Sequence, residues 1–265
     1  MGKSNPIKHV YLSIGFSDTS KLTIENFNTI SKIIKRPDSK ITPISNSEII
    51  FKSPDDISIN NKQIGITIED GLKLTGVREN DIFVLRKDEY TNWENFKVDS
   101  IETLLIILDN LKITEIDRVF LQFINEFFIT GSETILIEDY FRFYPQTNTL
   151  GDPLITGSNT NVSLYDEKTK VFTRLNHQFE QEGNDTMKIS LDIHSGMNFI
   201  DKNYNNNLPE LLNNIQSIHD YAKDLFISCL TNALNAKIAL SNTSSSFSSL
   251  NVFIKYIKQI VAKTK

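Results

Sequence analysis

The sequence predicts an α+β fold in which a mainly antiparallel sheet is covered by helices, among them one long C-terminal helix. Segments that alternate apolar with polar residues, as half-buried antiparallel strands do, are more numerous than helical segments. Strand and helix signals do not alternate strictly, which disfavours a parallel α/β sheet. From Leu208 onward the apolar residues recur at helical spacing for about thirty residues.

The chain is expected to begin with a strand and a helix. Residues 9–16 form a β-branched and aromatic run with polar borders, which is typical of a strand. A helix follows, because Thr23 suits the N-cap, Asn26 suits the third helical position, and apolar residues then recur at helical spacing until Pro37. Residues 38–63 are polar and interrupted by prolines, so we expect a meandering loop with at most one edge strand.

The middle of the chain predicts antiparallel strands, then a helix and a central strand. Residues 63–77 and 81–90 alternate apolar and polar side chains, with a turn at Gly71. A helix from Asp99 carries apolar residues on more than one face and is therefore expected to be sandwiched. Residues 118–129 are the most apolar strand candidate, so we expect them at the centre of the sheet.

Three further strands and the long helix complete the predicted domain. The strand candidates are 161–166, 170–180 and 186–194. The helix that begins at Leu208 is long enough to cross a whole sheet face. Residues 1–240 are therefore expected to form a single α+β domain.

The C-terminal segment differs in composition from the rest. Residues 241–251 are rich in serine and poor in apolar side chains, which indicates a linker. Residues 252–265 contain lysines, no acidic residue and an apolar stripe, which predicts a basic amphipathic helix. Three interpretations stay open: the helix docks on its own domain, fills a groove of a partner, or lies on an anionic membrane surface. Its candidate partner-binding residues are Phe253, Lys255, Ile257, Lys258 and Val261.

Composition limits the class of protein. The chain has 265 residues, 28 Lys plus Arg, 33 Asp plus Glu and a net charge of −5, which disfavours nonspecific duplex binding without excluding a local nucleic-acid site. A single cysteine excludes a disulfide framework and a cysteine-based zinc site, and it suits a reducing compartment. No signal peptide and no apolar span are recognisable. We therefore expect a cytoplasmic protein with no membrane span.

Several segments together resemble a sporadically distributed prokaryotic family of unknown function. The resemblance rests on a Y-x-x-W-x-x-F segment, an R-x-G-L-R-Y-I-N strand, an L-D-I-D strand and a closing helix, matched here by Tyr90, Trp93, Phe96, Arg118, Leu121, Phe123, Ile124, Asn125, Leu191, Asp192, Ile193, His219 and Phe226. This sequence departs from the family pattern at Phe120, Gln122 and His194, where the family has glycine, arginine and aspartate. The resemblance implies a fold and a mobile bacterial gene neighbourhood of the kind that carries defence genes. It implies no reaction.

Enzyme signatures that a sequence can reveal are missing. The chain contains no GxxxxGK[ST], no GxGxxG after a strand, no GxSxG and no HExxH. These absences disfavour phosphate-cradling, hydrolase and zincin chemistry and predict neither a metal nor a cofactor. They favour a noncatalytic protein without deciding the question.

Asp192 and His194 are the sharpest polar pair. Two residues apart on one strand, they point to the same face at about 7 Å, a geometry that suits a divalent metal or a shared proton. In the competing interpretation the pair simply belongs to the solvent-exposed face of the strand, while Leu191 and Ile193 face the core. A metal site needs a third and a fourth ligand, which the sequence does not reveal.

Two more positions are candidate binding residues. Arg118 opens the central strand, where it either fixes a carboxylate or phosphate on an open sheet face or forms an ion pair with Glu115 or Asp139. His219 on the long helix is either a core histidine or a catalytic group that meets His194 across the helix–strand contact.

The aromatic segment and the cysteine have simpler expectations. The aromatic segment consists of Tyr90, Trp93 and Phe96. Its rings either stack on a nucleic-acid base or, as we favour, pack into the hydrophobic core. Cys229 is expected to be a buried thiol.

The favoured function is a noncatalytic binding or adaptor subunit that works with partner proteins encoded nearby, in bacterial antiviral defence. Protein contacts would use the exposed sheet face and the basic helix, and a homo-oligomer is compatible with this. The alternative is an enzyme or a small-ligand or nucleotide sensor with a site between the Asp192 and His194 strand and the long helix.

Overall fold

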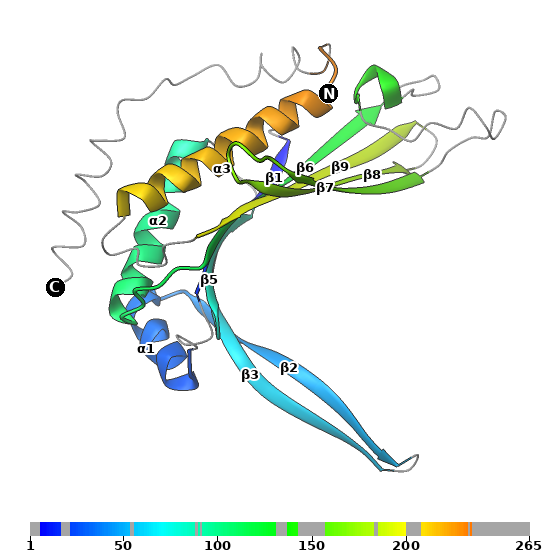
Figure 1. Ribbon diagram of the computed structural model, residues 1–265. Coiled ribbons are helices and arrows are strands. Elements are labelled where there is room, and N and C mark those ends of the chain that lie inside the picture. The colour runs from blue at the N-terminus through cyan, green and yellow to red at the C-terminus, as the bar shows by residue number, and fades with distance from the viewer. Residues whose placement is uncertain are drawn as a thin grey trace.

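The structure is a computed structural model that describes residues 6–16, 22–53, 56–87, 90, 92–130, 137–142, 157–182, 185–199, 208–232 and 234. Nine strands form one sheet in the order β2-β3-β4-β5-β1-β6-β9-β8-β7, and all neighbouring pairs are antiparallel (Figure 1). The strands are β1 Ile7–Gly15, β2 Lys40–Ser53, β3 Asp56–Asp70, β4 Lys73–Arg78, β5 Asp81–Lys87, β6 Arg118–Thr130, β7 Gly157–Tyr165, β8 Phe172–Glu182 and β9 Thr186–Asn198. The helices are α1 Ile24–Ile34, α2 Trp93–Asn110, the short 3-10 helix η2 Ile137–Asp139 and α3 Leu208–Cys229.

The sheet-dominated α+β class is therefore confirmed. β6 lies between β1 and β9, near the centre of the sheet, as its apolar sequence predicts. Val119, Leu121 and Phe123 are buried on one face of β6, whereas the residues between them are only partly buried on the other. This alternation arises because successive side chains of a strand point to opposite faces.

α1 and α2 begin where polar side chains satisfy free backbone N–H groups. A reciprocal capping box joins Thr23 and Asn26 at the start of α1, as predicted. Asn92 caps α2 by accepting a hydrogen bond from the backbone nitrogen of Asn95 at 2.9 Å. α2 thus begins at Trp93, earlier than the expected Asp99, because Trp93 and Phe96 belong to its first turn.

The prediction of a loop over residues 38–63 is wrong. β2 and β3 pair over most of this stretch as a long antiparallel ribbon that extends away from the helices (Figure 1). Backbone hydrogen bonds hold such a ribbon, and polar composition does not reveal them. Pro43 is tolerated because β2 is an edge strand, where an N–H group can be lost.

The core lies between one face of the curved sheet and the helices α1, α2 and α3, which all lie on that side (Figure 1). Ile14, Leu121 and Ile193 are fully buried there with the inner faces of the helices. Across the ranges given above, no helix covers the opposite face of the sheet (Figure 1). We call this opposite side the open face.

No helix within the described part of the chain is both long and apolar enough to cross a membrane. The predicted linker 241–251 and the predicted basic helix 252–265 lie outside the described residues.

Candidate functional site

The open face carries two neighbouring rows of polar and aromatic side chains. Strand register places one row across the central strands at Leu85, Tyr11, Gln122, His194 and Arg174. The adjacent row consists of Lys87, His9, Ile124, Asp192 and Asn176. Cross-strand partners share a face, so each row brings together residues from five strands that are far apart in the sequence.

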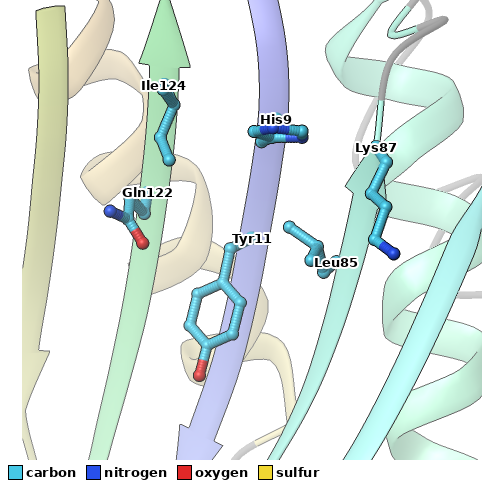
Figure 2. A pocket seen from close by; sticks show the side chains of 6 residues that line it. All are labelled: His9, Tyr11, Leu85, Lys87, Gln122 and Ile124. Carbon is cyan, nitrogen blue, oxygen red and sulfur yellow. The ribbon is translucent and has the colours of Figure 1, made fainter. Parts of the chain in front are cut away.

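A hollow of about 290 Å³ opens between β5, β1 and β6 on this face. Its lining comes from both rows, as Figure 2 shows: His9, Tyr11, Leu85, Lys87, Gln122 and Ile124. Leu85 and Ile124 contribute aliphatic walls, and Tyr11 stands between Leu85 and Gln122 in the strand register. The hollow is therefore mainly apolar, with a few polar groups at defined positions, which is the usual composition of a binding site.

Gln122 is held in one orientation by a carboxylate. Its Nε2 donates to both carboxylate oxygens of Asp192, each at 2.9 Å. An ionised carboxylate only accepts hydrogen bonds, so the amide nitrogen must face β9 and the amide oxygen must face away from it. In Figure 2 that oxygen is directed toward Tyr11 and the hollow.

Tyr11 and Lys87 are also held by partners outside the hollow. Arg78 donates from NH2 to the Tyr11 hydroxyl at 2.9 Å and binds Asp81 through two further hydrogen bonds of 2.6 Å. The Lys87 ammonium donates to Glu69 at 2.9 Å. Burial raises the pKa of Tyr11, so its hydroxyl stays protonated at neutral pH.

Asp192 and His194 do point to the same face, as the strand spacing predicts. Burial raises the pKa of Asp192, and its hydrogen bonds from Gln122 oppose that rise. Burial lowers the pKa of His194, whose Nε2 is buried without a hydrogen-bond partner among the described residues. The ring of Phe120 packs 5.0 Å from the His194 ring.

The Asp192 carboxylate is thus engaged by the Gln122 amide. Among the described residues, no group of three or more His, Cys, Asp and Glu side chains is arranged to hold an ion.

Arg118 lies on the same open face, at the N-terminal end of β6. Its side chain crosses Gly15, where an added Cβ would lie 2.6 Å from the Arg118 Nε. Within the described ranges it forms no ion pair with Glu115 or Asp139, so the salt bridge that we considered from the sequence does not form.

His219 lies on the other side of the sheet. Its ring stacks on Trp93 at 4.1 Å, and its Nδ1 lies 3.0 Å from an Asp220 carboxylate oxygen. Burial lowers the pKa of His219. It borders a cavity of about 100 Å³ together with Ile193, which faces the helices. Asp192 and His194 alternate with Ile193 and face away, so the alternative in which His219 meets His194 in one site does not occur.

The aromatic segment and the cysteine have structural roles, as favoured from the sequence. Trp93 and Phe96 are buried in the core, and Tyr90 packs against it. The Trp93 Nε1 donates to Gln216 of α3 at 2.9 Å. Cys229 is buried, which raises the pKa of its thiol.

Sequence reasoning missed most of the hollow. His9, Tyr11, Leu85 and Lys87 stand at the non-core positions of two strands, a signal that alternation alone supplies. Strand order then decides which of these positions become neighbours, and the sequence does not give that order. The tail candidates Phe253, Lys255, Ile257, Lys258 and Val261 lie outside the described residues.

No protein-family model and no curated protein matches the chain. The family resemblance therefore stays a prediction. The three positions at which the sequence departs from that family's pattern, Phe120, Gln122 and His194, are neighbours on the open face.

Proposed function

We propose that this chain is a noncatalytic binding protein whose open face docks a partner protein. The observation that carries the proposal is the hollow on a sheet face that no described helix covers, with its polar groups fixed in advance by Asp192, Arg78 and Glu69. Groups that are already held lose little entropy on binding, which favours association.

The protonation states around the hollow support binding rather than proton transfer. Catalytic acids and bases work best with a pKa near the operating pH. Tyr11 is held protonated by its raised pKa, and the lowered pKa of His194 keeps that ring neutral. Lys87 and Arg78 are each paired with a carboxylate. These groups suit recognition through hydrogen bonds and packing.

Charge supports a protein partner over a nucleic acid. Binding to phosphates depends on cations that displace counterions. Two of the cations next to the hollow, Lys87 and Arg78, are neutralised by Glu69 and Asp81, and the whole chain carries a net charge of −5.

The alternative of an enzyme or a small-ligand sensor has less support. Its residues lie on opposite faces of the sheet, with Asp192 and His194 on one side and His219 on the other. The cavity of about 100 Å³ beside His219 is smaller than the roughly 300 to 1,000 Å³ typical of ligand pockets.

The wider role stays a prediction. Partners encoded nearby, a bacterial source and a part in antiviral defence follow from the family resemblance alone. The cytoplasmic setting is a prediction from the single cysteine and from the lack of a recognisable signal peptide and apolar span. If the segment after Leu240 serves a partner, truncation there leaves the melting temperature unchanged and removes association. A truncated chain that melts much lower would assign the segment to the core.

A library of displayed random peptides, selected against the full chain, tests the proposal. We expect selected peptides to lose affinity at least about tenfold for Ile124→Arg, which fills the hollow with a charged side chain. Thr130→Arg is the matched control, because it adds the same charge on the same strand and face about 20 Å away. Selection of no peptide, or of peptides that bind both variants as tightly as the wild type, contradicts the proposal.

A further inference from the structure

We propose that the hollow takes an aromatic side chain that carries a hydrogen-bond donor, of the tryptophan or tyrosine type, presented by the partner protein. This inference rests on the proposed function and names the chemistry of its central contact.

The donor requirement follows from the fixed amide of Gln122. Because Nε2 is committed to Asp192 by two hydrogen bonds of 2.9 Å, the group presented to the hollow is the amide oxygen. An N–H or O–H group satisfies this acceptor. A carbonyl or carboxylate would instead place a second hydrogen-bond acceptor next to the Gln122 amide oxygen, and two acceptors without a hydrogen between them repel each other.

The aromatic requirement follows from the shape and lining of the hollow. Leu85, Ile124 and the Tyr11 ring offer apolar surface, and Figure 2 shows the Tyr11 ring broadside and the His9 ring edge-on. A flat group placed over Tyr11 therefore has the His9 ring at its border. Aromatic side chains bury large areas with few rotatable bonds, and tryptophan and tyrosine are enriched at the centres of protein interfaces.

The charges around the hollow favour a neutral occupant. Lys87 is paired with Glu69 at 2.9 Å, and Arg78 is paired with Asp81. An acidic group would be desolvated in the hollow beside Lys87 and Arg78, which already have carboxylate partners. The nearby Asp192 carboxylate is already engaged by the Gln122 amide. An indole or a phenol is neutral and offers one donor.

A nucleobase has a flat face and N–H donors too, but it arrives with phosphates. The net charge of −5 opposes phosphates, and Lys87 and Arg78 beside the hollow are already paired with carboxylates. A protein side chain is therefore the occupant to which the inference commits.

The test compares three probes on the full chain by NMR: N-acetyl-L-tryptophanamide, N-acetyl-L-phenylalaninamide and adenosine monophosphate. We expect the tryptophan amide to shift the signals of Ile124 and Leu85 and to bind about fivefold more tightly than the phenylalanine amide, which lacks the donor. Adenosine monophosphate should bind more weakly than either amide.

Two variants show whether the Gln122 oxygen causes this preference. Gln122→Met removes the acceptor and keeps a similar volume, so both amides should then bind equally. Asp192→Asn keeps Gln122 but removes the carboxylate that fixes its orientation, so the preference should fall. The second variant keeps the test valid if the first one fails to fold.

Three outcomes overturn the inference: equal binding of the two amides to the wild type, stronger binding of adenosine monophosphate, or a preference for tryptophan that both variants retain. The inference would also be overturned if the library selection yields peptides that contain neither tryptophan nor tyrosine and that Ile124→Arg still weakens. In that case the proposed function itself would stand.

Discussion

His177 makes the stability of this protein depend on pH in a way that tests the assignment of the two sheet faces. It lies on β8, on the face that the helices cover, and it is 1% exposed. Its ring packs 5.1 Å from Phe141 and 6.3 Å from Phe179. Burial disfavours the imidazolium and lowers the pKa of His177 from 6.5 to about 4.

The sign and size of the effect follow from proton linkage. Between pH 6.5 and 4 the unfolded chain binds a proton at His177 that the folded chain does not, so the free energy of unfolding falls as the pH falls. The full loss below the folded pKa is about 3 kcal/mol, and about 2 kcal/mol of it is present at pH 5 relative to pH 7.5.

The measurement is urea unfolding of the wild type and of His177→Phe at pH 7.5 and pH 5. Phenylalanine keeps an aromatic ring and does not titrate, so all other groups cancel in the comparison. We expect the wild type to lose about 2 kcal/mol more than the variant between the two pH values. An equal loss in both proteins would refute the reasoning, because it would mean that His177 is protonated as easily in the folded state as in the unfolded chain.

Three further substitutions test other parts of the account. Asp192→Asn should be at least as stable as the wild type at pH 7.5, and this advantage should shrink toward pH 5. The raised pKa means that, as the pH falls, the folded wild type binds a proton at Asp192 before the unfolded chain does, and this stabilises the wild type relative to the variant. Urea unfolding that shows the variant's extra stability increasing toward pH 5 would contradict this. Gly76→Ala should cost about 1 to 3 kcal/mol, since the new Cβ would lie 2.0 Å from the Phe83 ring, and Phe83→Leu should recover part of this in a double-mutant cycle. Trp93→Phe removes the 2.9 Å hydrogen bond to Gln216 and should lower the free energy of unfolding by about 1 kcal/mol, measured by urea unfolding followed by far-UV circular dichroism. An unchanged free energy of unfolding would mean that this hydrogen bond does not stabilise the contact between α2 and α3.

Much of the fold was predictable because its signals are local. Alternation marks β6 and β9, a capping box marks α1, and helical spacing marks α3. The ribbon of β2 and β3 was missed because backbone pairing holds it, and its polar sequence resembles a loop.

The candidate site was predictable only in part. That Asp192 and His194 share a face follows from the period of a strand. That Asp192 binds Gln122 depends on β6 pairing with β9 in one register, and a shift by one residue would move Gln122 to the other face. The alternative in which His194 meets His219 fails because β9 turns Leu191 and Ile193, rather than His194, toward the helices.

The most direct test of the central claim asks which face of the sheet meets a bound partner. The full chain, labelled at the isoleucine methyl groups, is titrated with the tightest peptide from the library selection and followed by NMR. Ile124 faces the hollow, and Ile193, 1% exposed on the neighbouring strand, faces the helices. The account predicts a large shift of the Ile124 methyl signal and little change at Ile193. A shift confined to Ile193 and the helix side, with Ile124 unchanged, would contradict it.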